Sequence, residues 1–403
     1  MINFDVVNDI PTTNKTVFLL ADLDVPLDEY GKIANDEKIQ NAMKTINYLV
    51  KTGARVVIAT HLGHPASEVD TRFSTKVIAK YLDKRMNCEV NFTPDCIGEQ
   101  AKRDIFRTEY GDIIVLENLL FHKEEKECDM NFARQLADGM NVYVNDNFAN
   151  SEYSYASVLA VPIFIRSTGG LLFTETIKNL DLFLSPNNKF TTAIIGGNKI
   201  GTKIDLLKNL AEHTKCIVLG GVIANTFLFT IGKNIENSIY EPDHQHQIED
   251  IISIANKNDC LIYLPQDVKV AGSSNYDGVV NKKIDELSKD DVIVDLGDES
   301  VKFIMSMIDI SRCIFWHGNT GIDGYNIDNS STILLGEKIS KLTRKKRLFS
   351  IVNGSDNTLS LQKAGYLKDF SFVSKTYQST LKYMSGKVLP GLEVLKRLSK
   401  QMI

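Results

Sequence analysis

The sequence has no long apolar run and no excess of positive charge. No stretch approaches the roughly 18 consecutive apolar residues that a membrane-spanning helix needs, and the first residues lack the basic and apolar regions of an export signal. Lysine and arginine total 46 against 51 aspartate and glutamate, which gives a net charge of −5. Such a chain has no global attraction for nucleic acid or for an acidic membrane. We therefore expect neither partner, and any anion site must be built locally.

Cysteine is also scarce and scattered. The six cysteines form no CxxC motif and lie near no pair of histidines, so the usual signatures of a zinc site or a disulfide framework are absent. They are Cys88, Cys96, Cys128, Cys216, Cys260 and Cys313. Dispersed thiols are typical of a reducing compartment, so we expect the protein to be cytoplasmic.

What the sequence does contain is an alternation of short β-branched runs with longer amphipathic segments. Residues 17–20 and 56–59 have the pattern of buried strands, and residues 39–50 have helical spacing. A second series of the same kind begins near residue 190 and includes a strand-like run at 293–297. This order predicts parallel sheets with helices on both faces. We predict an α/β fold made of two doubly wound, Rossmann-like domains.

The expected domain boundaries follow from this alternation. A chain of 403 residues with 43% hydrophobic content is long enough for two separate cores. We place the N-terminal domain at 1–168, a hinge helix at 169–183, the C-terminal domain at 184–388 and a tail at 389–403. A hinge between two lobes must stay free to close, so we expect a monomer.

Two polar turns follow predicted strands. Residues 60–65 read Thr-His-Leu-Gly-His-Pro after an apolar run, at the point where an open α/β sheet places its ligand. Residues 196–203 read Gly-Gly-Asn-Lys-Ile-Gly-Thr-Lys, and free amides at a helix start would face an anion there, with Lys199 and Lys203 on one side of the helix. The GxxxxGK[ST] spacing of a Walker A loop is absent. Taken alone, such a turn is more often packing than a phosphate site.

Two further features have ordinary structural interpretations. A single histidine such as His61 is usually a hydrogen-bonded structural residue. The run Glu124-Glu125-Lys126-Glu127 is typical of a solvated surface, and we expect it to be one.

Nine motifs occur in one order along the chain. They are Asp22-Leu23-Asp24-Val25-Pro26; His61-Leu62-Gly63-His64-Pro65; Glu117-Asn118-Leu119-Leu120-Phe121-His122; Val144-Asn145-Asp146; Gly196-Gly197 with Lys199 and Lys203; Gly220-Gly221 before Ala224-Asn225-Thr226-Phe227; Trp316 with Gly318; Gly354 with Asp356; and Gly386-Lys387 before Leu389-Pro390-Gly391. Together they resemble the phosphoglycerate kinase family along almost the whole chain. The resemblance implies a hinged kinase whose N-terminal domain holds 3-phosphoglycerate, whose C-terminal domain holds Mg-ATP or Mg-ADP, and whose tail returns to the N-terminal domain.

On the acid side, the resemblance assigns substrate contacts to positions that carry little positive charge here. These positions are Asp22, Asp24, Lys38, His61, His64, Leu120 and Tyr153. The family has arginine at four of them, which here are Lys38, His64, Leu120 and Tyr153, and two further basic positions are Glu152 and Tyr155. Arginine binds phosphate bidentately and stays charged, whereas histidine is mostly neutral at neutral pH. The sequence therefore predicts that the phosphoglycerate site has lost its charge complement.

On the nucleotide side, the resemblance retains more of the pattern. It implies phosphate contacts and a catalytic role for Lys199 and Lys203, and a magnesium ligand at Asp356. The full set of implied nucleotide-binding positions is Gly197, Lys199, Lys203, Gly220, Gly221, Gly324, Gly354, Ser355, Asp356 and Asn357. Gly324 replaces the ribose-contacting glutamate, Val222 replaces a third glycine, and side chains at 376–378 replace three glycines that approach the transferred phosphoryl group.

Three functions remain open on the sequence. We favour a non-catalytic homologue that binds Mg-ATP or Mg-ADP and acts through a protein partner. The second is a retargeted carboxylate kinase, in which Leu120, Tyr153 and Tyr155 shape a pocket for a less anionic small carboxylate. The third is an active phosphoglycerate kinase with compensating residues.

Overall fold

The computed structural model describes residues 2–66, 68–185, 190–272, 275–322 and 330–400. The chain divides into two compact units. The first consists of Met1–Lys178 with Val388–Ile403, and the second of Asn179–Lys387. Helix α7 (Leu171–Leu184) contributes residues to both. Within the described residues, no helix is both long enough and apolar enough to cross a bilayer.

The first unit is built on one six-stranded parallel sheet. Its strands lie in the order β3-β4-β2-β1-β5-β6. The sheet grows from β1 towards β3 on one side, and β5 and β6 extend it on the other side of β1. The strands are β1 (Thr16–Ala21), β2 (Arg55–Ala59), β3 (Val90–Phe92), β4 (Ile113–Val115), β5 (Val142–Asp146) and β6 (Arg166–Gly169). The helices are α1 (Glu37–Lys51), α2 (Lys76–Asp83), α3 (Gly98–Arg107), α4 (Lys123–Lys126), α5 (Met130–Ala137), α6 (Val161–Phe164) and α15 (Pro390–Lys400).

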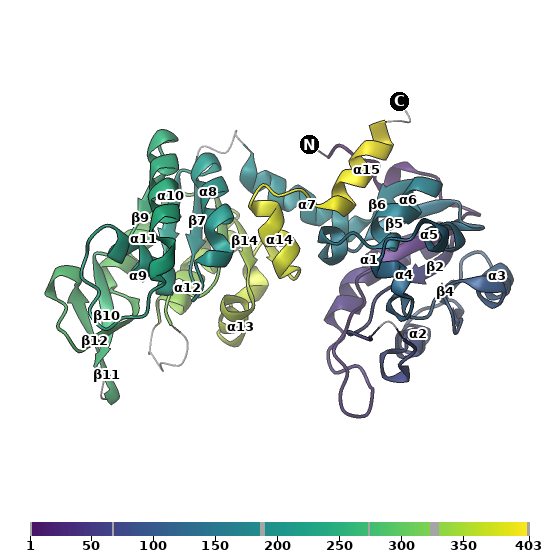
Figure 1. Cartoon of the computed structure of the whole chain (residues 1–403), viewed down its shortest axis with the longest axis horizontal. Coiled ribbons are helices and arrows are strands. Elements are labelled where there is room, and N and C mark those ends of the chain that lie inside the picture. Colours follow the sequence, from purple (N-terminus) through teal and green to yellow (C-terminus); the bar gives the residue numbers. More distant parts are fainter. Residues whose placement is uncertain (1, 67, 186–189, 273–274, 323–329, 401–403) are drawn as a thin grey trace. The chain divides into compact units, whose positions relative to one another are not determined.

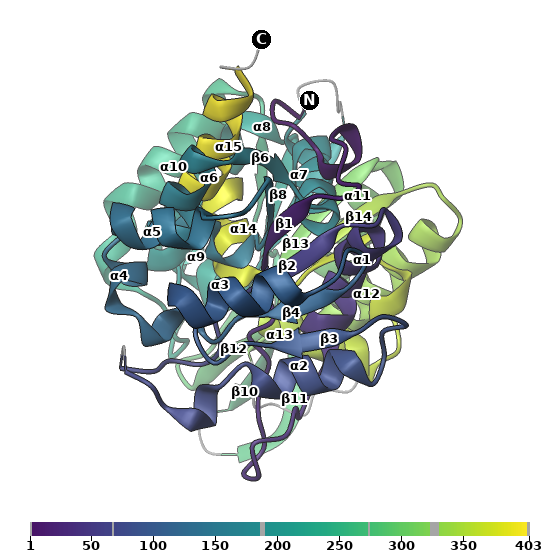
Figure 2. The same ribbon diagram turned by 90° about the vertical axis from the view of Figure 1, so that its right-hand side faces the viewer.

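Strand β1 is buried on both faces, as expected for a central parallel strand. Val17 and Leu19 belong to the core that α1 and α2 cover. Phe18, on the opposite face, stacks on Tyr143 of β5 with ring centroids 5.8 Å apart. Figure 2 shows α1 on one side of this sheet and α5 and α6 on the other. Alternate residues of one strand thus supply two cores.

The C-terminal tail packs on the first unit as helix α15. Leu392 and Leu395 are buried, and the Ser399 hydroxyl accepts a hydrogen bond of 2.8 Å from the Asp5 amide. Gly391 permits the close approach, because a Cβ there would lie 3.0 Å from Cα of Ser151. The chain's two terminal segments therefore belong to the same unit (Figure 1).

The second unit contains another six-stranded parallel sheet, in the order β15-β14-β13-β7-β8-β9. Its strands are β7 (Thr191–Ile195), β8 (Cys216–Leu219), β9 (Leu261–Tyr263), β13 (Cys313–His317), β14 (Phe349–Asn353) and β15 (Phe372–Ser374). Its helices are α8 (Ile204–His213), α9 (Gly221–Thr230), α10 (Gln245–Lys257), α11 (Asp298–Ile310), α12 (Ser331–Arg344), α13 (Ser355–Lys363) and α14 (Tyr377–Met384). Trp316 and Ile314 lie at the centre of its core. The predicted fold class is confirmed.

One strand predicted for the second parallel sheet belongs to a different sheet. The run at 293–297 falls in β12 (Asp291–Leu296), which pairs antiparallel with β10 (Asp267–Gly272) in a separate three-stranded sheet completed by β11 (Asn275–Lys283). Ile293 packs with Val268 and Val270 in a small core of its own. A short apolar run has the same pattern in either kind of sheet, and only its partners distinguish them.

Candidate active site

The first half of the candidate site lies at the carboxyl ends of adjacent strands in the first unit. Asp22 and Asp24 follow β1, His61 follows β2, and Tyr153 follows β5 by way of a short helical turn, η4 (Ala149–Glu152). Because β2, β1 and β5 are neighbours, these residues meet at the point where the strand order reverses. The fold thus gathers the predicted acid-side positions at the expected edge.

The charged groups of this half are already paired within the protein. The Lys38 ammonium lies 3.0 Å from an Asp22 carboxylate oxygen, with the lysine side chain 35% exposed and the aspartate 13%. The Asp24 carboxylate accepts a hydrogen bond of 2.8 Å from the Gly63 amide. Asp24 therefore fixes the His61–His64 turn. The negative charge of Asp22 offsets the positive charge of Lys38, which is the one lysine among the predicted acid-side positions.

His61 is fixed on both ring nitrogens. The Asn150 amide donates to Nδ1 at 2.7 Å, so Nε2 carries the proton and donates to Glu125 at 2.8 Å. The same Glu125 carboxylate accepts from the Ser157 amide at 3.0 Å and from the Ser157 hydroxyl at 2.5 Å. His61 is 4% exposed and Glu125 is fully buried. The expectation of a solvated surface for the Glu124–Glu127 run is therefore wrong at Glu125, because three hydrogen bonds hold this carboxylate inside.

Aromatic and aliphatic side chains occupy the remaining acid-side positions. The Tyr155 ring lies 5.2 Å from the His61 ring, and Tyr153 stacks on Tyr155 at 5.1 Å with an interplanar angle of 13°. Leu120 is 5% exposed within the turn η3 (Leu119–Phe121) and belongs to the core. His64 is exposed. This half of the site presents two carboxylates, one paired amine and a tyrosine stack.

The second half of the candidate site is formed by glycine turns after β7, β8 and β13. The Gly196 amide donates to the His317 carbonyl at 2.8 Å, the Gly197 amide to the Asn319 carbonyl at 2.8 Å, and the Gly221 amide to the Thr320 carbonyl at 2.7 Å. A Cβ on Gly196 would lie 1.9 Å from the Asn319 carbonyl oxygen, so the turns interlock.

The glycine amides of these turns are therefore not free for an anion. The Gly220 amide is used in the same way, since it donates to the Ile195 carbonyl at 3.0 Å. The expectation of a free amide at Gly197 is wrong, because a carbonyl group in the segment that follows β13 accepts its hydrogen bond. These glycines serve close backbone packing.

The two lysines of the second turn do not share a helix face. Helix α8 begins only at Ile204, so Lys199 lies in the preceding turn and is exposed, while Lys203 is 7% exposed. The Lys203 ammonium donates to the Lys199 carbonyl at 3.1 Å. Burial lowers the pKa of Lys203, and the negative charges of Glu241 and Asp356 oppose this effect. Lys203 is thus a buried cation whose only described hydrogen bond is to a backbone carbonyl.

Unsatisfied polar groups lie beside Gly354, at the start of α13. Gly354 has φ of 118°, a conformation that favours glycine. The side chain of Asn357 is fully buried, and both its amide nitrogen and oxygen lack a partner among the described residues, as does the amide nitrogen of Asn353. Ser355 and Asp356 are exposed, and the Ser355 hydroxyl donates to the Asp356 carboxylate at 2.9 Å.

These groups fit a magnesium nucleotide. The Asp356 carboxylate is the kind of oxygen ligand that Mg²⁺ takes from proteins, with nucleotide phosphates completing the shell. Lys203 supplies a nearby positive charge. The side-chain nitrogen of Asn353 can donate to a polar ligand, and the side-chain amide of Asn357 can both donate and accept. Gly324, the position to which the resemblance assigns the ribose contact, lies outside the described residues. Helix α14 begins at Tyr377, so side chains stand where the resemblance places three glycines.

A further group of possible metal ligands was missed from the sequence. Asp95, Cys96 and His122 bring one donor atom each within 4.8 Å of one another. However, one Asp95 oxygen accepts from the Cys96 amide at 2.7 Å and from His122 Nε2 at 2.9 Å, and burial raises the pKa of the Cys96 thiol well above its usual value. We interpret this group as structural. Cys96 and His122 are 26 positions apart in the sequence, which hides the group from a spacing search.

Comparisons with known proteins match nearly the whole chain. The phosphoglycerate kinase family model matches residues 7–387. The chain belongs to the phosphoglycerate kinase family. It is 37% identical over 393 residues to phosphoglycerate kinase of Wolbachia pipientis subsp. Culex pipiens (strain wPip), covering 97% of this chain and 99% of that protein. It is 34% identical over 395 residues to the enzyme named phosphoglycerate kinase in Aquifex aeolicus (strain VF5), covering 97% and 98%.

Solved structures give the same result. Phosphoglycerate kinase from Coxiella burnetii has a TM-score of 0.91 at 30% identity, covering 98% of this chain and 100% of that one. Phosphoglycerate kinase from Pyrococcus horikoshii OT3 has a TM-score of 0.78 at 25% identity, covering 99% and 100%. The resemblance inferred from nine motifs is therefore confirmed, and with it the membership in a family of glycolytic phosphotransferases.

His317 gives the nucleotide side a measurable pH dependence. Burial, and then the Lys203 charge, lowers the pKa of His317 from 6.5 to about 4, and its Nδ1 donates to Asn353 at 2.8 Å. Below pH 6.5 the unfolded state binds a proton that the folded state does not bind, so the contribution of His317 to stability falls as the pH drops from 6.5 to about 4. The full loss is about 3 kcal/mol.

We expect His317→Asn to remove this contribution, so that the stability of the variant relative to the parent protein rises as the pH drops. Urea unfolding at pH 7, 5.5 and 4.5 measures it, and His246→Asn, at a position 87% exposed, is the control. If His317→Asn kept the same dependence as the parent protein, the buried neutral histidine would not be its source.

Proposed function

We propose that this chain is a phosphoglycerate kinase homologue that no longer turns over 3-phosphoglycerate, keeps affinity for Mg-ATP or Mg-ADP in its second unit, and acts as a nucleotide-dependent binding protein. The observation that carries the proposal is the charge state of the acid half. Lys38 is offset by Asp22, and both ring nitrogens of His61 are engaged by Glu125 and Asn150.

The acid half lacks much of the positive charge that binding of 3-phosphoglycerate requires. 3-Phosphoglycerate carries a phosphate and a carboxylate, and each charge-assisted hydrogen bond to such a group contributes about 1.5–3 kcal/mol. The acid half offers the Asp22 and Asp24 carboxylates to these anions, together with the uncharged Leu120 and Tyr153. A ligand bound there would have to displace the Lys38–Asp22 pair and would still meet net negative charge.

The nucleotide half supports retained binding. A buried lysine and unpartnered buried amides are costly in the absence of a ligand, and a phosphate chain beside Lys203 would offset both costs. Mg²⁺ held by Asp356 would neutralise part of the phosphate charge. Since binding of this kind needs no acid substrate, the second unit can respond to nucleotide when the first unit has lost its own ligand.

Mg-ATP is expected to raise the melting temperature of the parent protein, and Lys203→Met is expected to weaken Mg-ATP binding about 10- to 100-fold. Methionine keeps most of the buried volume and removes the charge. Differential scanning fluorimetry over a range of Mg-ATP concentrations measures both effects. Lys208→Met is the matched control, because Lys208 lies on α8 and pairs with Asp250 at 2.9 Å. No Mg-ATP stabilisation of the parent protein would contradict a retained nucleotide site.

A further inference from the structure

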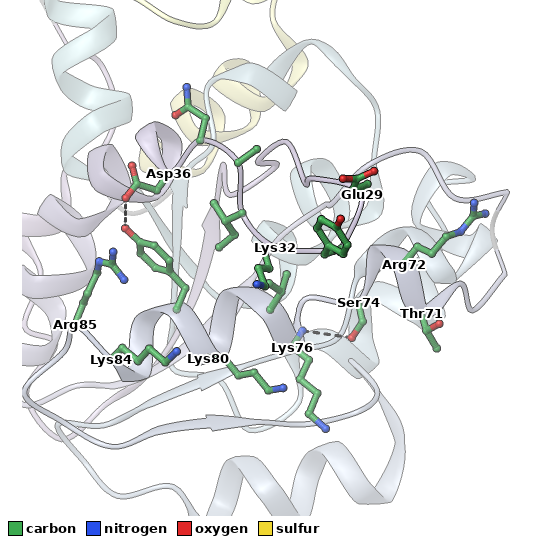
Figure 3. Close-up of a pocket in the computed structure, with 17 residues that line it drawn as sticks. Glu29, Lys32, Asp36, Thr71, Arg72, Ser74, Lys76, Lys80, Lys84 and Arg85 are labelled. Atoms are coloured by element: carbon green, nitrogen blue, oxygen red, sulfur yellow. Dashed lines mark hydrogen bonds between the residues drawn. The ribbon is translucent and has the colours of Figure 1, made fainter.

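A hollow of about 1320 Å³ lies on the first unit between the loop at residues 29–36 and the segment from Thr71 to Arg85, which contains α2. Figure 3 shows Lys76 and Lys80 on α2, Lys84 directly after its last residue, and Lys32 on the facing loop. None of the residues assigned to acid or nucleotide binding lines it. The hollow is therefore a separate feature of this unit.

The lining of the hollow is strongly basic in a chain whose net charge is −5. Six cationic side chains line it, against two carboxylates, Glu29 and Asp36. The cations are Lys32, Arg72, Lys76, Lys80, Lys84 and Arg85. All six are exposed. A local concentration of positive charge of this kind attracts anions even where the whole protein does not.

The two arginines among these cations interact with other side chains of this unit. Arg72 pairs with Asp70 at 2.6 Å, and Arg85 lies over the Tyr81 ring with its guanidinium carbon 3.7 Å from the centroid. The Tyr81 hydroxyl donates to Asp36, which lowers the pKa of that carboxyl. The loop and α2 are thus tied together at one end of the hollow, next to Arg85.

Among the described residues the lysines form no such ion pairs, although the Lys76 ammonium lies over the Phe92 ring at 5.8 Å from its centroid. Within the part of the chain that the structure describes, no carboxylate oxygen lies within 4.0 Å of the Lys32, Lys76, Lys80 or Lys84 ammonium group. Lys76, Lys80 and Lys84 follow each other at intervals of four residues, so they form one row along α2. Like charges at this spacing destabilise a helix, and an anion bound along the row would relieve the repulsion.

We propose that this hollow binds a small polyanion with consecutive phosphoryl groups. Eight residues of helix separate Lys76 from Lys84, so the row is about 12 Å long, and a single phosphate would contact only part of it. The hollow is open to solvent but has a wall on each side, α2 and the 29–36 loop, which favours a small ligand over a flat macromolecular surface. The ligand chemistry is that of inorganic polyphosphate or of a nucleoside triphosphate.

The test is isothermal titration of magnesium-free tripolyphosphate, and separately of ATP, into the full chain. The variant replaces Lys76, Lys80 and Lys84 with glutamine. We expect the affinity for tripolyphosphate to fall about tenfold or more in this variant. The matched control replaces Lys289, Lys302 and Lys363 with glutamine, which makes the same change of charge at exposed positions of the second unit. The affinity of this control is expected to stay within about twofold of the parent.

The outcomes separate the sources of the ligand. If the lysine row binds tripolyphosphate more tightly than ATP, the ligand is a linear polyphosphate. If it binds ATP more tightly, the ligand is a nucleotide. Equal losses in both triple variants, or a loss caused by Lys203→Met and not by the α2 variant, would overturn the proposal. Glutamine has nearly the helix propensity of lysine, and removal of the repulsion is expected to leave the melting temperature equal or higher. A melting temperature measured without ligand verifies that the variant is folded.

Discussion

Glu125→Ala is expected to lower the free energy of unfolding by about 3–5 kcal/mol. Glu125 is fully buried and accepts hydrogen bonds from His61 and from both the amide and the hydroxyl of Ser157. Alanine would leave these donors buried without a partner, and each such group costs about 1–3 kcal/mol. Urea unfolding monitored by circular dichroism measures the change.

Glu127→Ala is the matched control for this effect. Glu127 follows the same short helix, and its side chain is 59% exposed near Lys123. We expect a change within about 0.5 kcal/mol for this variant. Equal stability of the two variants would mean that the Glu125 network does not hold His61 in its structural role.

Much of the fold was predictable because it depends on local patterns. The buried runs of β1 and β2, the helical spacing of α1 and the turns after the strands all appear in the sequence, and the parallel order follows from them. The turns that carry Asp22, His61 and Tyr153 follow neighbouring strands, because carboxyl ends of adjacent parallel strands lie at one edge of the sheet.

The predictions that were wrong concern residues whose partners are distant in the sequence. Glu125 lies in a run of charges that is typical of a surface, yet its partners are 64 and 32 residues away. The Gly197 amide is consumed by a carbonyl of residue 319, and Lys203 is buried by packing that no local pattern reveals. Hydrogen-bond satisfaction of buried groups is a property of the assembled core, so periodicity and spacing do not report it.

The second large effect concerns turnover of 3-phosphoglycerate. A single arginine that stabilises a transferred phosphoryl group contributes about 10³–10⁵ in rate. We propose, from the family resemblance, that Lys38, His64, Leu120 and Tyr153 stand at four positions where the family has arginine; the lysine is paired with Asp22 and the leucine is buried. We therefore expect turnover at least about 10³-fold below that of an active family member.

This account is tested most directly by a coupled assay of 1,3-bisphosphoglycerate formation from Mg-ATP and 3-phosphoglycerate. The purified full-length chain is assayed beside the Coxiella burnetii phosphoglycerate kinase, which shares its fold at a TM-score of 0.91. The account predicts a rate indistinguishable from the enzyme-free background for this chain, at substrate concentrations that saturate the comparison enzyme. Turnover of about 1 s⁻¹ or faster, within the ordinary range of kinases, would contradict it and would assign the chain the reaction of its relatives.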